Sequence, residues 1–196
     1  MFLIYPIILG IIVGYLTGGR ITSLLERTLH WKLLALGALA IQLVIFSNLP
    51  VQDYLPGLAL EALHYLSYIS LLVFIIRNIK LPGILPIGSG IFLNTLAIFL
   101  NGGYMPTFPE NMKYTALAQY AAVIEQGGTS NNSSGITSDT VLPWLGDIFY
   151  LPSWIPLSNV FSIGDLLIGA GVFIYLLINM KSPKNLKKGR LQNEQG

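Results

Sequence analysis

Five polar side chains that could bind a ligand lie within the apolar stretches of this chain. If these stretches are aligned helices, all five lie at a similar distance from the same end of the bundle. Each lies about three to seven residues from the same end of its stretch, or about 5–10 Å from one surface at the rise of a helix. Ionisable and amide groups at such depth in an apolar bundle usually face its interior or a water-filled cavity. The five residues are Gln42, Glu61, His64, Asn94 and Asp165.

Convergent polar groups in a mostly apolar concavity are typical of a small-molecule site, so these residues predict an outward-opening ligand pocket. Gln42, His64 and Asn94 would form its floor. Glu61 and Asp165 would form its rim. We expect Glu61 and His64 to be the principal anchors, because residues one turn apart on a helix can share a proton.

A purely structural role is an open alternative for several of these residues. Ser162 and Asp165 have the S-x-x-D spacing of a capping box directly before an apolar run, and helix capping alone would account for Asp165. Gln42 and Asn94 could join helices through hydrogen bonds, each worth about 0.6 kcal/mol on average. The pair Glu61 and His64 is the hardest to explain in this way, because charged groups at membrane depth are costly.

No established catalytic or cofactor motif occurs in the sequence. It has no cysteine and no G-x-S-x-G, H-E-x-x-H, P-loop or dinucleotide-binding fingerprint. A metal site on Glu61 and His64 would need further carboxylates and a second histidine. The other histidine, His30, falls on the opposite side of the predicted bundle. We therefore expect no catalytic residue, no metal and no cofactor.

Composition indicates the scaffold that would position these groups. The chain has 196 residues, of which 53% are hydrophobic and 10% charged, whereas a soluble domain carries about 25% charge. Its mean hydropathy is +0.65. The pattern predicts an all-α membrane protein in which residues 1–180 form one bundle of five transmembrane helices. The predicted spans are residues 2–17, 31–49, 58–76, 84–100 and 162–179.

The basic residues predict the orientation of this bundle. If every stretch spans, ten of the 11 Lys and Arg residues fall on one side and only Lys113 on the other. Basic residues in short loops stay cytoplasmic, so the N-terminus is expected outside and the C-terminus inside. The net charge of +2 comes from the membrane flank and gives no sign of nucleic-acid binding. Residues 181–196 form a basic cytoplasmic tail that would attract anionic lipid through Lys181, Lys184, Lys187, Lys188 and Arg190.

The long outer loop, residues 101–161, is expected to contain three different parts. Residues 111–126 read as a short helix, and the polar, low-complexity residues 127–140 as a mobile segment. Residues 141–161 are rich in aromatic residues and proline, which predicts a segment lying in the outer membrane interface. This segment would cover the pocket with Asp147, Trp144 and Trp154.

Glycines at every fourth position of the first stretch predict a closely packed helix face. Gly10, Gly14 and Gly18 have the small-xxx-small spacing that lets helix backbones approach. The face would pack within the bundle or, alternatively, against another membrane protein.

Three short motifs resemble a known family. Residues 100–107 read LNGGYMPT, residues 145–152 read LGDIFYLP and residues 159–165 read NVFSIGD. With spans of this number and length, the chain resembles the bacterial multi-pass membrane proteins of the domain of unknown function 5317 family. The resemblance extends from the first helix to the fifth and implies a place in the bacterial cytoplasmic membrane. It implies no activity, ligand or catalytic residue.

Three functional hypotheses follow. The first is a non-enzymatic membrane protein that binds a small or lipidic ligand in the outward-facing pocket. The second is a structural or accessory subunit of a membrane complex. The third is an outward-facing enzyme that acts on lipid or envelope precursors, with Asp147 and Asp165 as its acidic groups.

Overall fold

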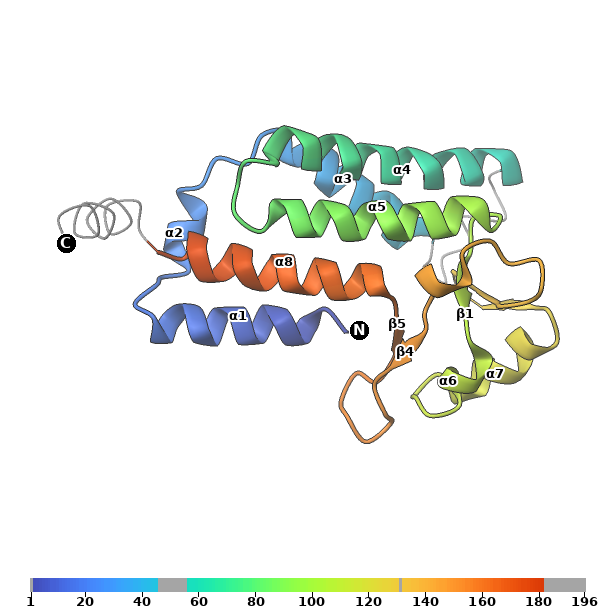
Figure 1. The fold of residues 1–196 in the computed structure, drawn as a ribbon. Helices are drawn as coiled ribbons and strands as arrows, with labels where there is room; N and C mark the ends of the chain where they lie inside the picture. The colour runs from blue at the N-terminus through green and yellow to red at the C-terminus, as the bar shows by residue number, and fades with distance from the viewer. Residues whose placement is uncertain (1, 46–55, 131, 182–196) are drawn as a thin grey trace.

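Five long apolar helices, aligned along one direction, dominate the fold (Figure 1). The structure, a computed structural model, describes residues 2–45, 56–130 and 132–181. Each predicted apolar stretch is helical over most of its length; the second helix is described to Ile45, and residues 46–49 of that stretch lie outside the described residues. The helices are α1 (Ile4–Leu16), α3 (Lys32–Ile45), α4 (Gly57–Asn78), α5 (Ile84–Leu100) and α8 (Ile163–Asn179).

Only one described helix is long and apolar enough to cross a membrane by itself. It covers Leu58–Asn78, and the other four apolar helices have 17 residues or fewer.

The helices pack in the spatial order α1, α8, α5, α4, α3, with the most extensive contact between α5 and α8. Glycine makes that contact possible. A Cβ atom on Gly171 of α8 would lie 2.6 Å from the carbonyl oxygen of Gly83, and one on Gly90 of α5 would lie 2.9 Å from the backbone nitrogen of Ile168. Since real Cβ atoms do not approach backbone so closely, the two helix backbones touch where a side chain would keep them apart.

The glycine face of α1 packs within the molecule. A Cβ on Gly10 would lie 3.0 Å from Leu176 Cδ1 of α8, and one on Gly14 would lie 2.5 Å from the sulfur of Met180. The assignment of Gly18 to the same face was wrong. Gly18 lies beyond the end of α1 with a φ of +82°, and a Cβ there would meet nothing within 4 Å. It makes the left-handed turn that glycine adopts readily, not a helix contact.

A small folded unit covers one end of the helices; we call residues 101–161 the cap unit (Figure 1). Strand β3 (Ser133–Gly135) lies at the centre of a small sheet, parallel to β1 (Met105–Thr107) and antiparallel to β2 (Thr129–Ser130). A second antiparallel pair precedes α8. The remaining elements are α6 (Pro109–Met112), α7 (Ala118–Glu125), η2 (Pro143–Leu145), β4 (Phe149–Tyr150) and β5 (Val160–Phe161).

Two predictions for the cap unit were wrong. The single helix predicted at residues 111–126 is two helices, because the Thr115 hydroxyl accepts a hydrogen bond from Leu117 N at 3.0 Å and donates one to Met112 O at 2.9 Å. Residues 127–140, predicted as a mobile segment, supply two strands instead: β3 pairs with β1, and β2 pairs with β3. A hydrogen bond of 3.1 Å from Ile136 N to Thr107 O extends this pairing.

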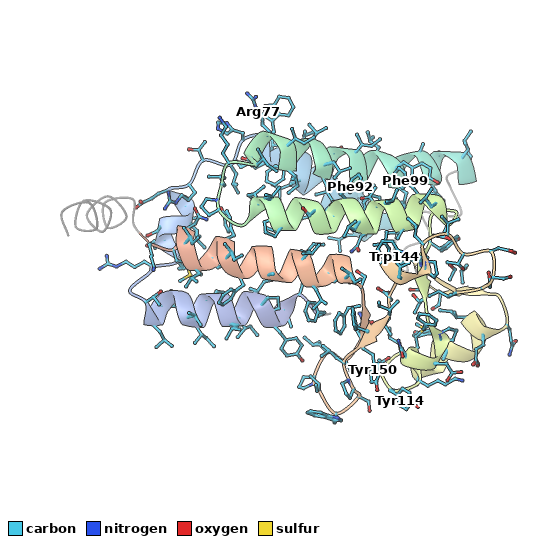
Figure 2. The ribbon with its side chains drawn as sticks, in the orientation of Figure 1. Arg77, Phe92, Phe99, Tyr114, Trp144 and Tyr150 are labelled. Atoms are coloured by element: carbon cyan, nitrogen blue, oxygen red, sulfur yellow. The ribbon has the colours of Figure 1, made fainter. Side chains whose placement is uncertain are left out.

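Basic residues gather at the end opposite the cap unit. The short helix α2 (Thr22–Leu25) lies there with the end of α8 (Figure 1), and Arg27 donates a hydrogen bond of 3.1 Å to Lys181 O. Arg77 lies at the same end (Figure 2), its guanidinium 5.6 Å from the centre of the Trp31 ring. Lys113, by contrast, belongs to the cap unit and pairs with Glu125 at 2.6 Å. The other basic residues of the predicted tail, Lys184, Lys187, Lys188 and Arg190, lie outside the described residues.

Candidate functional site

A cavity of about 470 Å³ lies where the helices meet the cap unit. Its walls come from α3, α4, α5 and α8 on one side and from β1, the α6–α7 region and the segments that precede α8 on the other. Its size is within the range of small-molecule sites, about 300–1,000 Å³. The cavity contains four of the six residues predicted for the ligand pocket, namely Gln42, Asn94, Asp147 and Asp165.

The helical wall of this cavity changes from polar to apolar along the bundle. Each of the four helices contributes a polar residue and, three positions away, an apolar one. In α3 and α5, which run toward the cap unit, the polar residue follows the apolar one; in α4 and α8, which run away from it, the order is reversed (Figure 1). In each of these pairs the polar residue is the one nearer the cap unit, although α5 also contributes the apolar Ile98, four positions nearer the cap unit than Asn94. The pairs are Gln42 with Leu39, Tyr68 with Leu71, Asn94 with Ile91, and Asp165 with Ile168.

The cap unit supplies a more polar opposite wall. Asp147 lies there with the amides of Asn132 and Asn159 and the ring of Tyr120. Its apolar members are Met105, Met112, Leu117 and Val160. A molecule in the cavity would thus meet a mixture of hydrogen-bonding and apolar groups at the cap end, and hydrocarbon toward the middle of the bundle.

The backbone of Asp147 is fixed against β1. Its N–H donates to Pro106 O at 2.7 Å, and the residue forms a parallel bridge with Thr107. Its carboxylate Oδ2 accepts a long hydrogen bond, 3.4 Å, from the Thr107 hydroxyl. Burial raises the pKa of the Asp147 carboxyl to about 8, and the negative charge of Asp165 adds to the rise. The carboxyl is thus held in place in the cavity wall, in surroundings that disfavour its ionised form.

Asp165 belongs to a closed polar network. The predicted capping box is confirmed: the Ser162 hydroxyl accepts from Asp165 N at 3.0 Å, and Asp165 Oδ2 accepts from Ser162 N at 3.1 Å. Asn94 of α5 joins this cap, because its Nδ2 donates to Asp165 Oδ1 at 3.0 Å and its Oδ1 accepts from Ser162 Oγ at 2.8 Å. Both structural alternatives, capping by Asp165 and helix joining by Asn94, are thus realised in residues that also line the cavity.

Gln42 also joins two helices at the cavity wall. Its Nε2 donates to the Ser67 hydroxyl at 2.6 Å, and that hydroxyl donates to His64 O at 2.6 Å. The chain of hydrogen bonds ties α3 to α4 at the level of Tyr68, where the polar part of the cavity begins.

The structure does not place His64 in the cavity. The residue is buried, with 7% of its surface exposed, and its ring lies 5.1 Å from that of Tyr68, which does line the cavity. His64 is therefore a neighbour of the site rather than part of its lining. The other predicted anchor, Glu61, belongs to α4, and its side chain lies outside the described residues.

The two tryptophans predicted to cover the pocket do not do so. Trp144 and Trp154 are 56% and 80% exposed, and neither lines the cavity. The aromatic residues of this region instead pack within the cap unit, where Tyr114 stacks on Tyr150 with ring centres 5.4 Å apart (Figure 2). Another pair, Phe2 and Phe161, stacks at 4.4 Å and fixes the start of α1 to β5.

Several polar lining residues were not predicted as site residues, among them Tyr68, Asn159, Asn132 and Tyr120. Tyr68 shares a helix face with His64, four positions earlier, which is the signal that could have identified it. Asn159 lies in one of the three family motifs. For Asn132 and Tyr120 the sequence offers no such signal, because their positions depend on the fold of the cap unit.

A family model, that of the family of unknown function DUF5317, matches residues 26–177. The chain belongs to this family. The DUF5317 match contains the whole cavity lining, from Leu39 to Ile168, but begins after α1, whereas the resemblance was expected to include the first helix. A protein of Thermotoga maritima described as uncharacterized is 30% identical over 123 residues, which are 60% of this chain and 64% of that protein. The match thus spans less than two thirds of the relative's length. No solved structure matches.

Proposed function

We propose that this DUF5317 protein is a multi-pass membrane protein that binds a small amphipathic or lipidic ligand in the cavity beneath the cap unit. The observation that carries the proposal is the polarity gradient of the helical wall. Four helices place a polar group toward the cap unit and an apolar group one turn deeper. A ligand with a polar head and an apolar body would satisfy both ends of the cavity at once.

The surface of the helices supports a membrane location. Large apolar side chains are exposed along them, among them Ile8 of α1, Leu43 of α3 and Ile76 of α4. Apolar side chains exposed along several helices of one bundle favour a cover, and lipid would supply it. With the basic end in the cytoplasm, the cap unit and its cavity would face the outside.

The orientation can be tested with single cysteines, because the natural chain has none. Ser153→Cys lies at an exposed position of the cap unit and Thr28→Cys at an exposed position of the opposite end. A membrane-impermeant maleimide applied to intact cells should label the first variant, and the second only after permeabilisation. The reverse pattern would contradict the orientation, and labelling of both in intact cells would contradict the membrane topology.

Ligand binding can be tested by native mass spectrometry of the protein released from its own membrane. We expect a defined small molecule or lipid bound to the wild type and to Asp139→Asn, which changes an exposed carboxylate of the cap unit. Ile91→Phe adds bulk at the apolar end of the cavity and should remove the bound species. A wild-type protein without any bound species, or equal retention by Ile91→Phe, would contradict the proposal.

An accessory subunit is a second candidate. The exposed rings of Trp144 and Trp154 favour it, since aromatic residues are enriched at protein interfaces. The glycine face of α1 gives it no support, because Gly10 and Gly14 already pack against α8.

A further inference from the structure

We infer that the ligand of this cavity is a cationic amphiphile, in which a protonated amine lies at the cap end and a hydrocarbon chain extends toward the middle of the bundle. The inference rests on the proposed function and adds the sign of the charge on the polar head.

The charged groups that line the cavity are both acidic. Asp147 approaches from the cap unit and Asp165 from the first turn of α8, and no Lys, Arg or His lines the cavity in the described parts of the chain. The basic side chain of the cap unit, Lys113, is engaged elsewhere, because it pairs with Glu125 at 2.6 Å on the surface. An anionic head would therefore meet the Asp165 carboxylate and the Asp147 carboxyl group with no basic side chain to neutralise it, whereas an ammonium group would supply the counter-charge that an ionised carboxyl lacks.

The two carboxylates differ in how far the protein satisfies them. Both oxygens of Asp165 accept hydrogen bonds of 3.0–3.1 Å, from Asn94 and from the backbone of Ser162. Asp147 receives its hydrogen bond from Thr107 over 3.4 Å, and burial together with the charge of Asp165 raises its pKa to about 8. Asp147 is thus the carboxyl with more to gain from a cationic partner, which would stabilise its ionised form.

A bare metal ion is a poorer fit than an organic cation. Among the described residues no three His, Asp, Glu or Cys side chains come together as a metal site requires. A metal would also leave the apolar end of the cavity, near Leu39, Ile91 and Ile168, without a partner. An alkyl chain attached to the ammonium group would fill that end. The lining also includes Tyr68 and Tyr120, and aromatic rings attract cations.

The test compares three probes with the same chain and different heads: dodecylamine, 1-dodecanol and dodecanoate. Binding to the full chain in phosphatidylcholine nanodiscs would be measured at pH 7 for the wild type, Asp147→Asn and Asp139→Asn. We expect dodecylamine to bind the wild type about tenfold more tightly than dodecanol, which corresponds to about 1.4 kcal/mol. Asp147→Asn should reduce this preference to about twofold or less, and the surface control Asp139→Asn should retain it.

The outcomes separate the inference from the proposed function. If dodecanol or dodecanoate binds the wild type as tightly as dodecylamine, the cavity binds amphiphiles but does not prefer a cationic head group. The proposed function then stands and the inference is wrong. The same conclusion follows if Asp139→Asn lowers the preference as much as Asp147→Asn, because nonspecific surface charge then accounts for it. If none of the three probes binds, the proposed function fails together with the inference.

Discussion

Asn94 Nδ2 donates a hydrogen bond of 3.0 Å to Asp165 Oδ1, which connects the middle of α5 to the first turn of α8. The amide oxygen of Asn94 meanwhile accepts from the fully buried Ser162 hydroxyl at 2.8 Å. The Asn94 side chain thus completes the N-terminal cap of α8, and Asn94 also lines the cavity. The contact is close because a Cβ at residue 164 would collide with the Asn94 amide, and Gly164 has none.

We predict that Asn94→Ala destabilises the protein by about 1–3 kcal/mol, because it removes one partner each from the buried Ser162 hydroxyl and the Asp165 carboxylate. Ser162→Ala should cost a similar amount through loss of the helix cap. Because the two residues share one network, the double variant should lose less than the sum of the single losses. Thermal unfolding in detergent would measure all three, and strictly additive losses would show that Asn94 acts independently of the cap.

The close packing of α5 on α8 predicts that adding a methyl group to a glycine at this contact lowers stability, whereas the same change at an open position of α3 does not. Gly171→Ala should destabilise the protein, because the new Cβ would lie 2.6 Å from both Gly83 O and Ile87 N. Gly37→Ala, in the exposed part of α3 where a Cβ meets nothing within 4 Å, should be neutral or stabilising by up to about 1 kcal/mol. Both changes raise helix propensity equally, so a lower melting temperature of Gly171→Ala alone isolates the packing effect. Equal melting temperatures of the two variants would contradict it.

Much of the helical part of this fold could be predicted from the sequence. Apolar stretches locate the five long helices because the pattern is sustained over many residues, and the S-x-x-D motif locates the start of α8 within one residue. The cap unit could not be predicted in the same way. Its strands have two or three residues, too few for an alternating pattern, and β1 pairs with β3 about 28 positions later in the chain.

The candidate site was predicted in part, for a related reason. Depth within the stretches identified Gln42, Asn94 and Asp165 as residues at one level, and all three line the cavity. Helical periodicity places His64 and Tyr68 on one face but does not show how far along that face a cavity extends. The cavity includes Tyr68 and excludes His64. Its opposite wall comes from the cap unit, whose fold depends on contacts between distant segments.

The raised pKa of Asp147 leads to a prediction about stability and pH. The folded protein retains a proton on this carboxyl up to about pH 8, whereas an ordinary aspartate loses it near 3.8. Between these values unfolding releases a proton, so rising pH destabilises the fold by up to about 1.4 kcal/mol per pH unit. Three other ionisable groups also line the cavity: the Asp165 carboxyl and the hydroxyls of Tyr68 and Tyr120. They are the same in the wild type and in a variant of Asp147, so a difference between these two proteins reports on Asp147.

Asp147→Asn cannot ionise, so it should escape this loss of stability. We expect its melting temperature to exceed that of the wild type by an amount that grows steadily from pH 5 to pH 8. Asp139→Asn, which changes an exposed carboxylate of the same cap unit, should follow the wild type throughout. Thermal unfolding of the three proteins in detergent, at half-unit steps from pH 5 to 8.5, would measure the difference. A constant offset between wild type and Asp147→Asn would show that the carboxyl is already ionised at pH 5.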